Sequence, residues 1–215
     1  FINFTKMEIT MGSINYTFYN KDLPKHLKFS DCIAIDTETM GLDTNRDRLC
    51  LVQISSGDNH AHLVQIQPQN TYPNLINLLK DNSKKKIFHF ARFDLTMLYK
   101  NLNVECSNIY CTKIASKLAR TYTDKHGLKE LCKELLNIEI SKQKQSSDWG
   151  NKNLSEDQLK YAASDVLYLH DIMKKLNEIL IRENRIKIAE KCFDFLTTRV
   201  YLDLHGWHES DIFTH

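Results

Sequence analysis

Residues 32–39 read CIAIDTET, and the order of apolar and acidic side chains in this stretch indicates both a fold and a site. Cys32 to Ile35 form a continuous apolar run, which is typical of a strand buried on both faces of a sheet. Side chains alternate along a strand, so Asp36 and Glu38 share one face at its end. Two carboxylates about 4 Å apart repel by roughly 4 kcal/mol at an effective dielectric near 20. Protonation of one carboxyl or a cation between the two would relieve that repulsion, and a solvated strand end is the structural alternative.

The segments around this strand predict a single α/β domain. Further strands are expected at 14–19, 49–54, 60–66 and 86–90, where apolar or β-branched runs are separated by turn residues. A helix is expected at 72–79, and from Ala91 onward the apolar pattern changes to the helical period, with helices expected at 93–100, 112–120, 128–136, 155–180 and 185–197. We therefore predict an α/β fold with a mixed central β-sheet, flanking helices and a helical C-terminal half.

The start of the helix expected at 155–180 fixes which of its side chains share a face. Ser155 is a natural N-cap residue, and Gln158, three residues later, completes a capping box. With the helical phase set in this way, Tyr161 and Asp165 lie one turn apart on the same face. Asp165 stands in an apolar stretch of this helix, where an aspartate is unfavourable unless it is paired or metal-bound.

A further acid follows the strand expected at 86–90. Asp94 falls in or near the first turn of the next helix, where a favourable interaction with the helix dipole is the structural alternative. His89, in the same segment, has the alternative of a hydrogen-bonded core histidine. Together, four acids from a strand end, a helix start and a helix interior would converge on hard cations that prefer oxygen ligands, such as Mg²⁺ or Mn²⁺.

Composition excludes several classes of protein. The chain has 215 residues, 42% hydrophobic and 26% charged, which suits one folded domain rather than a disordered segment. With 6 Gly and 3 Pro it is not collagen-like, and it contains neither an apolar run long enough to span a membrane nor a signal peptide in its first dozen residues. Six cysteines without metal-ligand spacing indicate free thiols and a cytoplasmic location. Met7 and Met11 are both candidate natural starts.

The formal net charge is only +2, but basic residues are concentrated between Lys113 and Lys144. This segment holds eight basic and four acidic residues, which gives it a local charge of +4. The eight basic residues are Lys113, Lys117, Arg120, Lys125, Lys129, Lys133, Lys142 and Lys144. Such a segment would follow a polyanion backbone, with Lys117 and Arg120 as substrate contacts. A solvated helical face is the alternative.

Three motifs, in this order, resemble those of the DEDD exonuclease superfamily, tyrosine subclass: DTET at 36–39, the segment from His89 to Asp94, and Tyr161-x-x-x-Asp165. The surrounding sequence is similar to ribonuclease D, with RLCLVQI at 48–54 and SSDW at 146–149. The resemblance covers about residues 23–180. It implies an RNase H-like exonuclease fold and 3′→5′ hydrolysis of a nucleic acid with two divalent metal ions, Mg²⁺ or Mn²⁺.

The resemblance also implies a role for each residue. Asp36 bridges both ions, Glu38 and Asp165 hold the ion that carries the attacking water, and Asp94 helps hold the second ion, which stabilises the leaving 3′-oxygen. Tyr161 orients the water.

Other side chains near these motifs are candidates for substrate binding. In related exonucleases a leucine at the position of Leu42 wedges against the terminal bases, and core packing is its alternative. Trp149 is expected to pack beneath the loop that precedes Tyr161, with base stacking as the alternative. His60 and His62 alternate on a strand, but no third metal ligand lies nearby in the sequence. The substrate contacts expected beside the acids are Thr37, Met40, Leu42 and His89.

The predicted function is a 3′→5′ exoribonuclease that acts on single-stranded RNA ends, in a single domain of residues 1–215 with a catalytic core at about 23–180 and a C-terminal helical extension at 181–215. About 35 residues follow Leu180, too few for the additional helical domains of family members dedicated to transfer-RNA maturation. The expected partner is nucleic acid, with no membrane and no obligatory protein partner. The alternatives are the same chemistry on DNA ends, a non-catalytic nucleic-acid-binding module, and a purely structural interaction domain.

Overall fold

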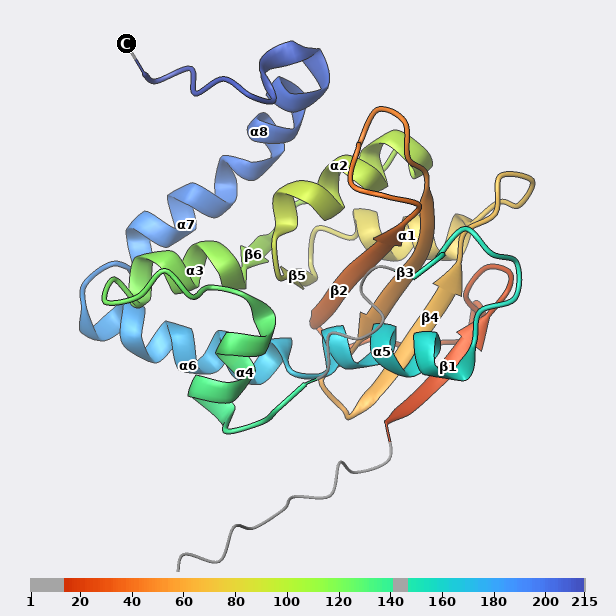
Figure 1. The fold of residues 1–215 in the computed structure, drawn as a ribbon, viewed down its shortest axis with the longest axis horizontal. Helices are drawn as coiled ribbons and strands as arrows, with labels where there is room; N and C mark the ends of the chain where they lie inside the picture. The colour runs from red at the N-terminus through yellow and green to blue at the C-terminus, as the bar shows by residue number, and fades with distance from the viewer. Residues whose placement is uncertain (1–13, 141–146, 215) are drawn as a thin grey trace, which may run out of the picture.

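The computed structural model describes residues 14–140 and 147–214, in which a six-stranded mixed sheet has the strand order β1-β4-β3-β2-β5-β6 (Figure 1). Strand β2 pairs antiparallel with β3 and parallel with β5, and β1 adds a parallel edge strand to β4. Ile33 and Ile35 of β2 are fully buried, as the apolar run predicts. The strands are β1 Asn15–Tyr19, β2 Cys32–Thr39, β3 Leu49–Ser55, β4 His60–Gln65, β5 Lys85–Phe88 and β6 Ile109–Cys111.

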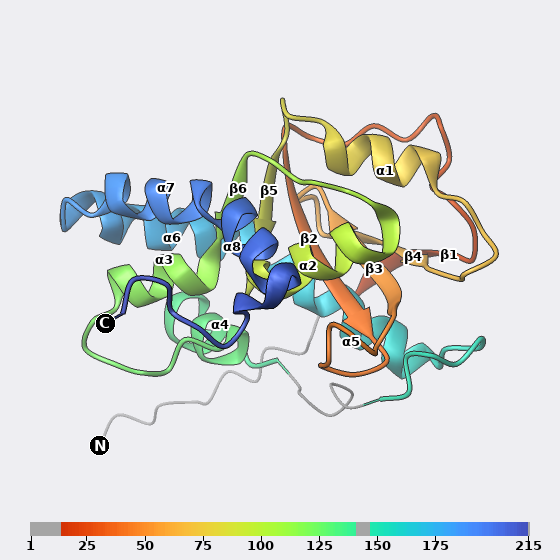
Figure 2. The same ribbon diagram turned by 90° about the horizontal axis from the view of Figure 1, so that it is seen from above.

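Helices cover both faces of the sheet and form the C-terminal half, so the predicted fold class is confirmed. Figure 2 shows α1 and α5 on opposite faces of the sheet, with α3, α6 and α7 gathered beyond its β6 edge. The helices are α1 Pro73–Lys80, α2 Ala91–Leu102, α3 Thr112–Ala119, α4 Leu128–Leu136, α5 Glu156–Leu167, α6 Leu169–Arg182, α7 Ile186–Asp194 and α8 Leu196–Leu202, followed by a π-helical turn η1 at Asp203–Trp207.

Three elements differ from the sequence prediction. The helix expected at 185–197 is interrupted at Phe195 and appears as α7 and α8. The helix expected at 155–180 is broken at Tyr168 into α5 and α6. The break has a packing reason, because α5 lies on strands β1 to β4 whereas α6 packs against α3 and α4. Strand β6 was not predicted; with three residues it is too short to show an alternating pattern.

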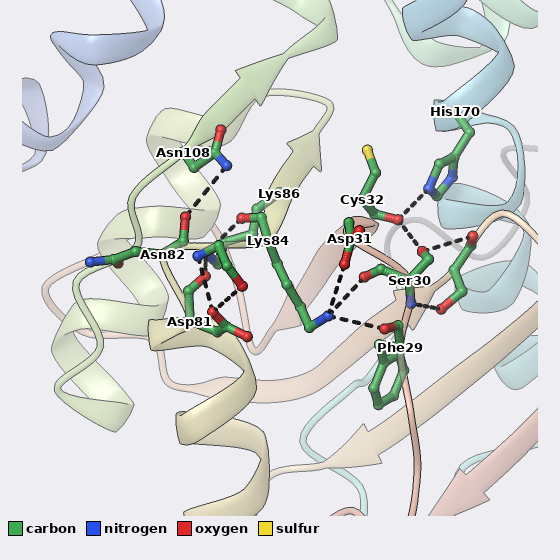
Figure 3. Close-up of polar contacts among 12 residues, drawn as sticks. Phe29, Ser30, Asp31, Cys32, Asp81, Asn82, Lys84, Lys86, Asn108 and His170 are labelled. Carbon is green, nitrogen blue, oxygen red and sulfur yellow. Dashed lines mark hydrogen bonds and ion pairs between the residues drawn. The ribbon is translucent and has the colours of Figure 1, made fainter.

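Two lysines near the start of β5 have ammonium groups that bind backbone carbonyls (Figure 3). Lys86 is fully buried, and its ammonium donates hydrogen bonds to the carbonyl oxygens of Asp81 (2.6 Å), Lys84 (3.1 Å) and Ser107 (3.2 Å). The Lys84 ammonium donates to two carbonyl oxygens in the loop before β2. Three acceptors replace the hydration of the buried charge. This end of β5 is therefore held firmly, and β5 leads directly into the segment that carries Asp94.

The six cysteines are free thiols, as their spacing predicts. Burial raises the pKa of Cys50 to about 11 and that of Cys106 to about 12, so both remain protonated and unreactive at neutral pH. Within residues 14–140 and 147–214, no helix has the length and apolar character that a membrane span requires.

Candidate active site

Three carboxylates converge where the end of β2 meets α5. Ligand oxygens of Asp36, Glu38 and Asp165 all lie within 4.8 Å of one another. Alternation along β2 places the first two on one face, and the register shift between Glu38 and Thr39 marks a bulge at this point, a device that re-aims side chains beside active sites. The capping box at the start of α5 fixes the helical phase that brings Asp165 to the same place. In this box Gln158 N donates to Ser155 Oγ (3.3 Å) and Ser155 N donates to Gln158 Oε1 (3.0 Å).

Asp94 joins the same cavity from the first turn of α2 and is almost fully buried. The Thr37 hydroxyl donates a hydrogen bond of 2.6 Å to Asp94 Oδ1, which ties the helix start to β2. Asp94 is not one of the three acids whose oxygens lie within 4.8 Å of one another, but its negative charge acts on Glu38, and the charge of Asp36 acts on Asp94. The four predicted acids are thus brought together from β2, α2 and α5.

Burial and, for three of them, neighbouring negative charge raise the pKa values of the four acids. Burial raises the pKa of Asp36 to about 7. Burial, followed by the charges of Asp36, Asp165 and Asp94, raises the pKa of Glu38 well above its usual value. The pKa values of Asp94 and Asp165 are raised by burial and then by the charge of Asp36. A site that disfavours its own charged state in this way is complementary to added positive charge.

Tyr161 lies one helical turn before Asp165 and lines the cavity. Burial, and then the negative charges of Asp165, Glu38 and Asp36, raise the pKa of its hydroxyl. The hydroxyl therefore stays protonated and acts as a hydrogen-bond donor. The buried Trp149 ring supports it, with ring centroids 6.2 Å apart, in agreement with the packing role expected for Trp149.

The cavity above the acids has a volume of about 680 Å³, and acidic, apolar and basic side chains line different parts of it. The acids and Tyr161 form one region. Exposed apolar side chains from the loop after β2, Met40 and Leu42, border it, as do Phe90 and Phe93 from the start of α2. Among the residues that the structure describes, the lysines that line the cavity are Lys113 of α3 and Lys129 of α4.

The loop that carries Met40 and Leu42 is held by Asp47. Asp47 Oδ2 accepts a hydrogen bond from Asp43 N (3.0 Å), and the Thr39 hydroxyl donates to Gly41 O (2.5 Å). A Cβ at Gly41 would lie 2.3 Å from Asp47 Oδ2, so any larger residue at this position would push the Asp47 carboxylate out of its place. Leu42 is 86% exposed, which rules out core packing for its side chain.

The predicted substrate contacts are only partly placed at the cavity. Thr37, Met40, Leu42 and His89 line it, although the Thr37 hydroxyl is committed to Asp94 and His89 Nδ1 lies 2.9 Å from Thr112 Oγ1. Lys117 is exposed on α3 but does not line the cavity.

The prediction that Arg120 contacts substrate is wrong. Its side chain is 0% exposed, because its guanidinium pairs with the Glu134 carboxylate and donates to Ser116 Oγ (3.0 Å) and Lys125 O (2.7 Å). A buried arginine that uses its donors in this way ties α3 to α4 and the turn between them. Of the basic stretch, Lys142 and Lys144 lie outside the described residues.

Sequence reasoning did not single out Phe90, Lys113 or Lys129. The two lysines belong to the basic stretch, and only the packing of α3 and α4 shows that these two face the cavity. The residues His60 and His62 are not near the acids: their rings contact Thr17 (2.9 Å) and Tyr19 (3.0 Å) on the edge strand β1.

Comparisons with known proteins agree with this arrangement. The sequence profile of a family described as 3′-5′ exonuclease matches residues 14–181. The structure of Brucella melitensis NrnC with bound Mg²⁺ is 54% identical and superposes with a TM-score of 0.88 over 94% of this chain and 99% of that one. The same protein bound to pGG is 55% identical, with a TM-score of 0.90 over 94% and 100% of the two chains.

Curated relatives are longer proteins. The chain is 30% identical to Bartonella henselae ribonuclease D over 159 residues, which is 74% of this chain and 39% of that protein. It is 35% identical to Aquifex aeolicus DNA polymerase I over 177 residues, 81% of this chain and 28% of the polymerase. The chain thus spans less than half of either protein. With the profile match over most of its length and the acids of all three motifs in one cavity, the chain belongs to the 3′-5′ exonuclease family, as a ribonuclease D-like DEDD exonuclease.

Proposed function

We propose that this chain is a divalent-metal-dependent 3′→5′ exoribonuclease that removes nucleotides from single-stranded RNA ends. The observation that carries the proposal is the convergence of Asp36, Glu38 and Asp165 within 4.8 Å, beside Asp94 and the protonated hydroxyl of Tyr161. A binding module that holds phosphates has no use for four carboxylates in its cavity, because like charges repel. Structural neighbours that carry Mg²⁺ or pGG support both the cation and the nucleotide.

The donor set fits two hard cations, Mg²⁺ or Mn²⁺. All four side chains offer carboxylate oxygens, and burial together with neighbouring negative charge raises the pKa values of these acids, which supports a bound cation as the partner of their charged forms. Asp36, Glu38 and Asp165 would hold one ion, and Asp36 with Asp94 would hold the second. When bound, the ions supply charge stabilisation for the phosphate and a lowered pKa for water.

The remaining work falls to this chain's own side chains. The Tyr161 hydroxyl, kept protonated by its surroundings, donates a hydrogen bond that orients the attacking water rather than removing a proton from it. Attack on phosphorus breaks the bond to the 3′-oxygen of the preceding nucleotide, which takes up a proton, and a nucleoside 5′-monophosphate is released. Leu42 and Met40 project from a fixed loop beside the acids, where they separate the terminal nucleotide from the rest of the strand.

RNA rather than DNA is proposed because ribonuclease D is among the relatives. The similarity to a DNA polymerase makes DNA the second arm of the test. Purified protein is incubated with 5′-labelled RNA and DNA of equal sequence, with Mg²⁺, with Mn²⁺ and with excess chelator.

Faster shortening of RNA in either metal, and none in chelator, is the expected result. Full activity in chelator would refute the metal-dependent mechanism. Faster shortening of DNA would refute the RNA assignment while leaving the chemistry intact.

A further inference from the structure

Phe90 has a backbone conformation that its residue type disfavours. It lies between β5 and α2 with φ 116° and ψ 49°. Among the described residues, every other non-glycine position with positive φ is an asparagine, the residue that tolerates this region best: Asn59, Asn103, Asn108, Asn137 and Asn184. A bulky aromatic side chain at φ 116° is a genuine outlier.

The neighbouring residues impose this conformation. Phe88, at the end of β5, and Ala91, at the start of α2, are both fully buried. His89 Nδ1 is held 2.9 Å from Thr112 Oγ1, and Phe93 N donates to Phe90 O (3.0 Å) in the first turn of the helix. The chain must reverse between two fixed points, and residue 90 absorbs the turn. An asparagine would do so with less strain, so the turn does not explain the phenylalanine.

The surroundings of the ring point to a ligand. The Phe90 side chain is 46% exposed although it lines the cavity that holds the acids. The Lys113 ammonium lies 4.3 Å from the ring centroid, over one face of the ring. Phe90 thus places an open aromatic surface, with a cation beside it, four residues before Asp94. An aromatic face next to a cation suits a nucleobase and the phosphate attached to it.

We infer that Phe90 is a substrate-binding residue whose ring stacks on a nucleobase that flanks the scissile phosphate. The inference rests on the proposed function and adds to it a residue that lies inside the second motif but is neither its histidine nor its acid. Leu42, in the loop after β2, borders the same cavity and gives a base a second apolar surface. Backbone strain at residue 90 is retained because the ring is needed in this position.

The test combines a protein variant with a substrate variant. Phe90→Asn removes the ring and relieves the backbone, so its thermal stability should equal or exceed that of the wild type. The substrates are one RNA with all its bases and two copies that carry an abasic ribose at the last or the next-to-last position. Single-turnover kcat/KM is measured for each protein on each RNA.

For the wild type, one of the two abasic RNAs should lose about tenfold in kcat/KM, the loss of one base–aromatic stack. Phe90→Asn should lose about tenfold on the intact RNA and distinguish intact from abasic RNA by less than twofold. Phe90→Tyr, which keeps an aromatic face, should behave as the wild type. Phe213→Asn removes another exposed phenylalanine, one that does not line the cavity, and should change nothing.

The inference is overturned if Phe90→Asn discriminates against the abasic RNA as strongly as the wild type does, or if the wild type cleaves all three RNAs equally. Both results require an active wild type. If the wild type cleaves no RNA, the proposed function fails instead, so the two failures are distinguishable.

Discussion

Neutralising one acid of the cluster should stabilise the metal-free protein while it abolishes activity. At 4.8 Å and an effective dielectric of about 20, two full charges repel by about 3.5 kcal/mol. Asp36 takes part in two of the three such pairs with Glu38 and Asp165. Proton uptake and local relaxation relieve part of this repulsion, so we expect Asp36→Asn to raise the free energy of unfolding by about 2 kcal/mol at pH 8. For a chain of this size that is a rise in Tm of about 4 to 8 °C.

The effect should depend on pH. Because burial raises the folded pKa of Asp36 to about 7, the folded state binds more protons than the unfolded state between about pH 4 and 7. The free energy of unfolding of the metal-free wild type therefore falls as pH rises through this window. Asp36→Asn removes one of the groups responsible, so its stability should fall less, and the two proteins should differ little at pH 5.

Thermal denaturation in chelator at pH 5 and pH 8 measures this difference. Asp31→Asn is the matched control, because Asp31 immediately precedes the same strand and is exposed. Adding Mn²⁺ or Mg²⁺ at pH 8 should raise the Tm of the wild type and of Asp31→Asn, but not that of Asp36→Asn. An Asp36→Asn protein that is less stable than the wild type at pH 8 in chelator would refute the charge-repulsion argument.

Three further substitutions separate the roles of other residues. Tyr161→Phe should lower the single-turnover rate on the order of a hundredfold, through misplaced water, with Mn²⁺ affinity by calorimetry unchanged; a wild-type rate would show that Tyr161 only packs. Arg120→Met removes the ion pair with the half-exposed Glu134 and the hydrogen bonds to Ser116 Oγ and Lys125 O, so it should lower the free energy of unfolding in urea by about 1 to 2 kcal/mol and leave KM unchanged. A stable variant with raised KM would restore the substrate role predicted from sequence. Lys113→Met should raise KM and reduce the salt dependence of binding by about one ion, because Lys113 lines the cavity, whereas Lys117→Met should do neither. Equal effects of the two substitutions would show that a position in the cavity wall does not decide which lysine binds the substrate.

The acids and their supporting elements could be predicted because local rules position them. Strand alternation places Asp36 and Glu38 together, and the capping box sets the phase of Asp165. These rules depend on residues within one turn or one strand, so sequence alone contains them. The helix break at Tyr168 could not be found in this way, because it depends on how α5 and α6 pack against different partners.

The basic stretch shows where such reasoning fails. Charge counts describe Lys113, Lys117 and Arg120 alike, but the Arg120 guanidinium pairs with Glu134, fourteen positions away, and is removed from solvent. Phe90 was missed for a similar reason. The Phe90 side chain is exposed because the backbone reverses between two buried residues, whereas a phenylalanine in the sequence would be expected to be buried.

The central claim is that these acids hydrolyse RNA from a free 3′ end with divalent metal. The most direct measurement compares a 5′-labelled linear RNA with a circular RNA of the same sequence, each incubated with the wild type and Mn²⁺, with Asp36→Asn as the inactive control. We expect a ladder that shortens one nucleotide at a time from the 3′ end of the linear RNA, an intact circle, and no products with Asp36→Asn. Cleavage of the circle at a comparable rate, or an active Asp36→Asn protein, would contradict the claim.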